Sequence, residues 1–173
     1  VRELGAISEI VSGVALGGVS TRSGVPVPYL RVANVQDGFL DLSEVKYIRV
    51  AQADAAKFAL QCGDVLMNEG GDFDKLGRGT VWRDELPGCI HQNHVFRVRT
   101  NHGQLLPEFL AAYSASDSGK AFFVKLSKQS TNLASINSSQ LNAFPVPVPT
   151  IEEQERIRTC LSQLTTRISH ETT

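Results

Sequence analysis

The segment SKQSTNLASINSSQLNAFPVPVPTIEEQERI, residues Ser127–Ile157, contains four local signals that decide how the C-terminal part of the chain folds. Residues Gln129–Asn132 are all polar and have few apolar neighbours, so they predict a surface loop. The cap residues of Asn137–Gln140 predict a short helix, which must end before Pro145. Every second residue from Pro145 to Pro149 is proline, which predicts an extended spacer or an edge strand.

The fourth signal predicts a helix that begins at Ile151. Thr150 and Glu153 have the spacing of a capping box, and Glu152 adds negative charge at the helix N-terminus. One face of this helix carries an apolar seam for a partner or a dimer, formed by Gln154, Ile157, Leu161, Leu164 and Ile168. Two interpretations stay open, because two heptads are short for a coiled coil: the helix pairs with another helix, or it folds back onto its own domain.

The order of several short motifs resembles the target recognition domain of the specificity subunit of type I restriction-modification systems. The resemblance covers nearly the whole chain and depends on the ordered set, since no single motif is specific. The motifs are Gly63–Leu66 (GDVL), His91–Val98 (HQNHVFRV), Leu133–Asn137 (LASIN), Pro145–Pro149 and the helix residues Glu153, Gln154 and Ile157.

This resemblance implies a target recognition domain over residues 1–149 and the start of a coiled-coil or dimerisation helix over residues 150–173. It further implies sequence-specific binding of double-stranded DNA, with methyltransferase and restriction subunits as partners that are directed to one half of a bipartite target. S-adenosylmethionine, ATP and magnesium would bind those partners, and this chain would hold no cofactor and no metal.

The chain departs from the family pattern because it contains one recognition domain and a short helix. It is therefore expected to be half of a two-domain subunit, a half-length subunit that forms a homodimer, or a shortened chain. Because the sequence begins with Val1 and not with methionine, we expect a processed or excised segment of a longer natural chain.

Composition predicts one globular domain in the cytoplasm. The chain has 173 residues and 42% hydrophobic content, which is enough for a core, and it has no apolar run of membrane-spanning length and no signal peptide pattern. Its three cysteines, Cys62, Cys89 and Cys160, are widely spaced, which predicts reduced and mostly buried thiols.

The pattern along the chain predicts an α+β fold: a mostly antiparallel twisted sheet with helices packed on one side, followed by the C-terminal helix that starts a coiled coil. Strands are expected at residues 29–35, 45–50, 64–68, 76–82 and 90–99, and helices at 51–60, from 107 and at 119–126.

Charge is distributed unevenly although the net charge is −1. Residues 37–85 contain ten acids and six bases, whereas residues 86–151 contain two acids and five bases. Arg97 and Arg99 alternate with the apolar Phe96 and Val98, so the last strand is expected to have one core face and one basic face. A segregated basic face suits phosphate contact, and a solvated face without a ligand is the alternative.

Several polar residues are candidates for DNA contact. Gln92 and Asn93 carry amides that can pair with adenine edges, and Arg78 lies between two glycines that allow close backbone approach. The alternatives are amides that satisfy a turn, a glycine-containing hairpin with a solvated arginine, and a linker around Arg22. The full candidate set is Arg22, Asn68, Lys75, Arg78, Gln92, Asn93, Lys125, Lys128, Gln129, Ser130, Thr131 and Asn132, with Lys125 and Lys128 expected at phosphates.

Catalytic motifs are missing from the sequence. It has no P-loop, no nucleophile elbow and no NPPY-like loop of amino-methyltransferases. Cys89, His91 and His94 do not predict a metal site, because side chains alternate along an extended segment and the three do not lie on one side. A nuclease site is not predicted either, because no lysine follows two residues after Glu69. The chain is therefore expected to be a non-catalytic recognition subunit.

Two other hypotheses remain beside DNA recognition. One is a protein-interaction module that uses only the C-terminal helix, and the other is a fragment of a restriction enzyme with its own nuclease activity. The residues do not reveal a DNA target sequence.

Overall fold

A computed structural model describes residues 1–16, 24–71, 76–77, 79–127 and 134–171. The elements follow in the order β1 (Arg2–Glu3), η1 (Leu4–Ala6), β2 (Ser8–Ser12), β3 (Val25–Leu30), β4 (Lys46–Val50), α1 (Gln52–Phe58), β5 (Val65–Asn68), β6 (Gly70–Gly71), β7 (Gly79–Val81), β8 (Ile90–His91), β9 (Val95–Thr100), α2 (Pro107–Ala115), α3 (Asp117–Ser127), β10 (Ala134–Ser135), α4 (Ser138–Asn142), β11 (Pro145–Val146) and α5 (Ile151–Glu171).

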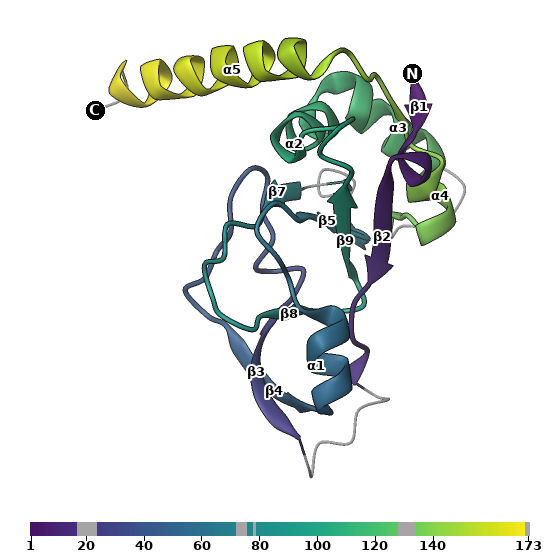
Figure 1. The fold of residues 1–173 in the computed structure, drawn as a ribbon, viewed down its shortest axis with the longest axis vertical. Helices are drawn as coiled ribbons and strands as arrows, with labels where there is room; N and C mark the ends of the chain where they lie inside the picture. The colour runs from purple at the N-terminus through teal and green to yellow at the C-terminus, as the bar shows by residue number, and fades with distance from the viewer. Residues whose placement is uncertain (17–23, 72–75, 78, 128–133, 172–173) are drawn as a thin grey trace.

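The body is elongated, with α2, α3 and α4 at one end and α1, β3 and β4 at the other (Figure 1). An antiparallel four-stranded sheet in the order β2-β9-β5-β7 lies between them. Strand β5 is buried on both faces, and its Val65 and Met67 point into the same core as Phe96 and Val98 of β9. The prediction of a mostly antiparallel α+β fold is confirmed for these elements.

The main core joins this sheet to the helices at its end. Phe123 of α3 packs against Phe144 with ring centroids 4.7 Å apart, and both side chains are fully buried. Pro107 occupies the start of α2, where its missing N–H costs nothing. α4 confirms the short helix that the cap residues predicted, and Asn137 and Gln140 form a complete capping box at its start.

A second sheet in the order β4-β3-β8 forms the other end of the body and packs against α1. Its presence corrects the expected single sheet, and its β3–β8 pair is parallel. β3 contains Pro26 and Pro28, opposite Arg49 and Tyr47 of β4. Because hydrogen bonds to one neighbour use every second residue, both prolines are tolerated in a strand that pairs with β4.

The expected strand at residues 29–35 is wrong beyond Leu30, because Asn34 organises a turn there. The Asn34 side chain accepts from the Arg31 N–H at 2.9 Å and donates to the carbonyls of Asp41 and Glu44, each at 2.9 Å. A buried asparagine that satisfies three backbone groups favours this turn over a continued strand. The expected strand at residues 90–99 is also divided into β8 and β9.

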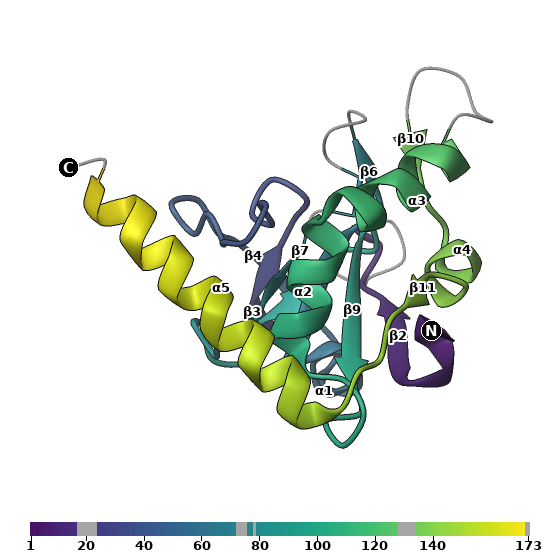
Figure 2. The ribbon, with the colours of Figure 1, turned by 90° about the horizontal axis from the view of Figure 1, so that it is seen from above.

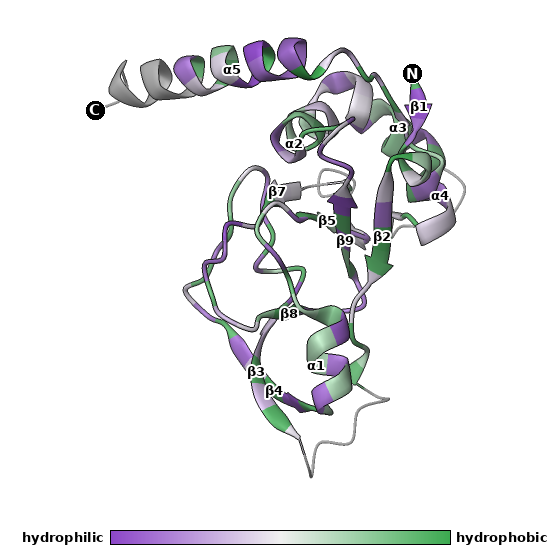
Figure 3. Cartoon of the chain, in the orientation of Figure 1, coloured by the Kyte–Doolittle hydropathy of each residue, from purple (hydrophilic) through white to green (hydrophobic). Residues whose placement is uncertain are grey.

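Helix α5 begins at Ile151, as predicted. The Thr150 Oγ1 accepts from the Glu153 N–H at 3.3 Å, and the pKa of Glu152 is lowered by its own backbone N–H and by the Thr150 hydroxyl. The helix runs beside α2, and its C-terminal part extends past the body (Figures 1 and 2). Hydrophobic and hydrophilic residues both occur along the coloured part of α5 in Figure 3. None of the helices in the described residues is long and apolar enough to cross a membrane.

Candidate nucleic-acid interface

Three parts of the chain that contain or adjoin residues expected to contact DNA meet at Glu69. The Glu69 N–H donates to the His94 carbonyl at 2.9 Å, and the Glu69 carbonyl accepts from the Ile136 N–H at 2.8 Å. Next to it, β6 pairs with β10, with Gly71 opposite Ala134 and Gly70 opposite Ser135. We call residues Glu69–Gly71, Gln92–His94 and Ala134–Ile136 the recognition edge; β6 and β10 lie side by side in Figure 2.

The Gln92–His94 turn of the recognition edge has a firmly held backbone. The Gln92 N–H donates to the Leu30 carbonyl at 2.9 Å, and the Asn93 N–H donates to the Val14 carbonyl at 3.1 Å. The Ser12 hydroxyl donates to the Asn93 carbonyl at 2.6 Å. The Gln92 and Asn93 side chains stay partly exposed, so their predicted role as readers of base edges is compatible with their position.

Side chains of the recognition edge are also connected to each other. His94 is 55% exposed, and its Nδ1 contacts the Glu69 carboxylate. The His94 Nε2 lies 3.2 Å from the Asn93 Nδ2. The contact between Glu69 and His94 could not be predicted from the sequence, because the two residues are 25 positions apart and no local pattern relates them.

Asn68 differs from its expected role as a DNA contact. Its side chain is buried, and its Nδ2 donates to the Val35 carbonyl at 2.9 Å and to the Val32 carbonyl at 3.3 Å. An amide used in this way fixes the chain before the recognition edge. In this fold it does not reach a ligand, so we leave it out of the proposed interface.

The basic face expected on β9 is wrong, because Arg97 is buried and both arginines pair with acidic residues of the protein itself. Arg97 is 4% exposed, donates to the carbonyls of Lys57 and Ala59, and pairs with Glu9 at 3.3 Å. Burial lowers the pKa of Arg97. Arg99 donates two hydrogen bonds to the buried Asp64 at 2.7 and 2.8 Å, and this contact raises the pKa of Arg99.

The other bases that the structure describes between residues 86 and 151, Lys120 and Lys125, lie on α3. Lys120 pairs with Asp37 at 3.2 Å, whereas the side chain of Lys125 is exposed. α3 packs against β10, so Lys125 is on a helix that adjoins the recognition edge. Its predicted phosphate contact stays a prediction. The other expected contacts lie outside the described residues and also stay predictions: Arg22, Lys75, Arg78, Lys128, Gln129, Ser130, Thr131 and Asn132.

Cys89 and His91, which follow the Pro87–Gly88 turn, are buried, whereas His94 is 55% exposed. His91 is buried, and its Nδ1 contacts the Val95 carbonyl at 2.6 Å; burial lowers its pKa to about 4. Burial raises the pKa of Cys89 to about 12. Cys62 and Cys160 are exposed, so the expectation of mostly buried thiols is wrong, although all three cysteines are free. In the described parts of the chain, no three metal-ligating side chains are grouped.

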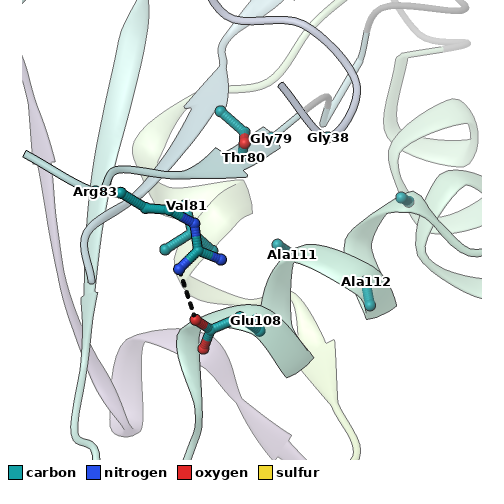
Figure 4. Close-up of a pocket in the computed structure, with 9 residues that line it drawn as sticks. Gly38, Gly79, Thr80, Val81, Arg83, Glu108, Ala111 and Ala112 are labelled. Carbon is teal, nitrogen blue, oxygen red and sulfur yellow. Dashed lines mark hydrogen bonds and ion pairs between the residues drawn. The ribbon is translucent and has the colours of Figure 1, made fainter. Parts of the chain in front are cut away.

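A hollow of about 240 Å³ lies between β7, α2 and the turn at Gly38. Small side chains such as Ala111 and Ala112 line it, and Arg83 reaches across to Glu108 at 3.3 Å (Figure 4). Its two charged side chains, Arg83 and Glu108, pair with each other, and this lining does not by itself indicate an active site.

Gln154 was expected on the partner face of α5, and the structure corrects this. Its side chain is fully buried, accepts from the Leu106 N–H at 2.8 Å, and donates to the carbonyls of Gln104 and Pro149, each at 2.9 Å. These bonds fix the start of α5 to its own domain. The seam residues after it are more exposed: Leu161 by 41% and Leu164 by 53%.

The exposed part of the seam borders an apolar groove between α2 and α5. The groove has a volume of about 230 Å³ and is lined by Phe109, Ala112, Tyr113, Ser116, Ile157 and Leu161. The first turns of α5 therefore pack on their own domain, and Leu161 lines this open groove while Leu164 is 53% exposed. The Ile168 side chain is outside the described part of the chain.

Comparison with known proteins shows similarity to type I specificity subunits. The chain is 26% identical over 163 residues to the putative type I restriction enzyme MjaX specificity subunit of Methanocaldococcus jannaschii, covering 94% of this chain and 38% of that protein. It is 22% identical over 160 residues to the type I restriction enzyme EcoKI specificity subunit of Escherichia coli, covering 91% of this chain and 34% of that protein. The chain thus spans less than two fifths of these curated relatives.

Solved structures show a similar fold. The HsdS subunit from Thermoanaerobacter tengcongensis matches 98% of this chain with a TM-score of 0.63 and 17% identity, over 38% of its own chain. A chain from a structure of a type I R-M system matches 97% of this chain with a TM-score of 0.66 and 18% identity, over 38% of its own chain.

The sequence model of one family, the type I restriction modification DNA specificity domain, matches residues 1–173. Because this match covers the whole chain, the protein belongs to the family of type I restriction modification DNA specificity domains.

Proposed function

We propose that this chain is the sequence-specific DNA-binding domain of a type I specificity subunit, and that it recognises one half of a bipartite target. The match of the family over residues 1–173 carries this proposal. The recognition edge supports it, because it joins three parts of the chain that contain or adjoin residues expected from the sequence to contact DNA.

The recognition edge provides chemistry for base contacts more than for phosphate contacts. Gln92 and Asn93 offer amide donors and acceptors on a fixed backbone, whereas Arg97, Arg99 and Lys120 are paired with Glu9, Asp64 and Asp37. Amides read base edges, and positive charges near phosphates set overall affinity. We therefore assign sequence reading to this edge and phosphate contact to Lys125 and the neighbouring predicted residues.

Catalysis belongs to partners in this proposal. A methyltransferase subunit would bind S-adenosylmethionine, and the methyltransferase and restriction subunits would supply ATP and magnesium chemistry in the cytoplasm. This chain would direct them to the target, and the exposed seam of α5 would form the start of a coiled coil. That coiled coil would join a second recognition domain, in the same subunit or in a homodimer.

Selection from a random duplex pool tests the proposal. The 173-residue chain is incubated with a pool of random-sequence duplexes, and bound duplexes are sequenced after several rounds. We expect one enriched motif of a few base pairs. A bound pool without any motif would contradict the proposed function and leave non-specific DNA binding or a protein-interaction module.

The nuclease hypothesis is tested with the same enriched duplex. An end-labelled duplex is incubated with the chain and millimolar magnesium, with manganese in a parallel sample. Our proposal predicts an intact duplex in both samples. Cleavage that increases with protein concentration would support a restriction enzyme fragment.

A further inference from the structure

Glu69, His94 and Asn93 form a row of hydrogen-bonded side chains on the recognition edge. The Glu69 carboxylate contacts the His94 Nδ1, and the His94 Nε2 lies 3.2 Å from the Asn93 Nδ2. The backbone fixes the same three residues, since the Glu69 N–H donates to the His94 carbonyl and Ser12 and Val14 hold Asn93. The row therefore connects β5 and β6 to the turn between β8 and β9.

The donors and acceptors of the row have one consistent order. An ionised carboxylate only accepts hydrogen bonds, so the His94 Nδ1 must donate to Glu69. The Asn93 Nδ2 only donates, so the His94 Nε2 must accept from it. Both conditions hold for a neutral His94 with its proton on Nδ1, and the contact with Glu69 favours this tautomer.

This order fixes the direction of the Asn93 amide. One Nδ2 hydrogen is used at His94, which leaves the other Nδ2 hydrogen and the Oδ1 of a partly exposed side chain for a ligand. An amide that presents one donor beside one acceptor matches the N7 acceptor and the N6 donor of adenine in the major groove. An amide that can rotate by half a turn would also present its donor and acceptor in exchanged positions, which do not match adenine.

We propose that Asn93 reads one adenine of the target and that Glu69 and His94 are positioning residues that hold its amide in the reading direction. This inference rests on the proposed function, and it adds the residue that reads, the base that it reads and the residues that orient it. Glu69 itself acts through His94 and does not contact the base.

The test is a selection from the random duplex pool that compares variants position by position. Wild-type protein, Asn93→Ala, Glu69→Ala and Glu69→Gln are used, with Glu155→Ala as the control because Glu155 pairs with Arg158 on α5. Asn93→Ala should remove the preference at one adenine position, where a bidentate contact gives roughly 5- to 150-fold discrimination. All other positions of the motif should stay enriched.

The Glu69 variants separate positioning from a structural role. Glu69→Ala should lower the preference at the same adenine position by about twofold or more, because the amide can then adopt both directions. Glu69→Gln should retain the wild-type preference, since its Oε1 still accepts from the His94 Nδ1. In an Asn93→Ala background, Glu69→Ala should have no further effect at that position. Thermal unfolding of each variant shows that the fold is kept.

Different results separate this inference from the proposed function. The inference is overturned if Glu69→Ala changes a different position or none, or if Glu69→Gln loses as much preference as Glu69→Ala. A wild-type selection that enriches no motif overturns the proposed function, and this inference with it. A motif in which Asn93→Ala affects a base other than adenine refutes the assignment of the base.

Discussion

At the scale of single residues, the pair of Arg99 and Asp64 shows why the alternating arginines of β9 do not form the basic face that the sequence predicted. Asp64 is 1% exposed and also accepts from the Gln61 N–H at 2.7 Å. Arg99→Ala leaves this carboxylate buried without its cation, so we expect the free energy of unfolding to fall by about 3–5 kcal/mol. Urea unfolding measures the change.

The exposed pair of Arg83 and Glu108 provides the matched control for Arg99. Arg83→Ala should cost less than about 1 kcal/mol, because water screens an exposed pair. Equal losses for the two variants would contradict the structural role of Arg99. Strongly reduced DNA affinity of Arg99→Ala without lost stability would return Arg99 to the interface.

His91 makes stability depend on pH. Its pKa is about 4 in the folded protein, below the ordinary value of 6.5, because burial disfavours the charged ring. The unfolded chain therefore binds the proton first as pH falls. His91 favours folding fully above about pH 6.5, and this contribution of about 3 kcal/mol is lost progressively towards pH 4.

Urea midpoints at pH 7.5, 6, 5 and 4.5 measure this dependence in wild type and in His91→Gln. The variant cannot titrate at this position, so its stability should fall less steeply between pH 6.5 and 4.5. Parallel curves for both proteins would show that His91 does not contribute to the acid sensitivity.

At the scale of elements, Gln154 determines how α5 leaves the domain. Gln154→Ala removes three hydrogen bonds and leaves the Leu106 N–H and two carbonyls without this partner. We expect a loss of about 2–4 kcal/mol in unfolding free energy. Gln163→Ala on an exposed position of the same helix is the control and should change stability by less than about 0.5 kcal/mol.

The later seam of α5 is predicted to serve assembly. Leu161→Lys with Leu164→Lys should abolish self-association or partner binding while the domain stays folded, because the two residues are 41% and 53% exposed and lie outside the buried core. Gln163→Lys adds one charge to the opposite face and should leave association unchanged. Sedimentation and thermal unfolding measure both effects; unfolding of the double variant would place the seam in the core.

Element boundaries could be predicted where the signal is local. Asn137 and Thr150 cap α4 and α5 through hydrogen bonds within one turn, and Pro107 suits the first turn of α2, so the sequence alone was sufficient for these three helices. Residues whose partner is distant in the chain were misassigned. Asn68 binds the carbonyls of Val32 and Val35, and Gln154 binds Gln104, so their burial depends on tertiary packing.

At the scale of the whole molecule, the fold class was predictable, but the division into two main sheets was not. Alternation of apolar residues shows that a strand exists, and it does not show which strand lies beside it. The convergence of Glu69, His94 and Ile136 is a property of this topology. Therefore the candidate residues could be named from the sequence, and only the structure showed which of them lie together.

The central claim is that this chain distinguishes DNA sequences, with affinity supplied by phosphate contacts. A paired titration tests it most directly: the duplex enriched by selection and a shuffled duplex are titrated at 50 to 200 mM salt with wild type, Lys125→Ala and Lys57→Ala. Lys57 lies on α1, at the end of the body opposite α3 (Figure 1), and serves as the control.

Wild type should bind the selected duplex at least about tenfold more tightly, and both affinities should fall steeply with salt. Lys125→Ala should weaken both duplexes by the same factor and reduce the salt slope by about one, whereas Lys57→Ala should match wild type. Equal affinity of wild type for the two duplexes at every salt concentration would contradict the account.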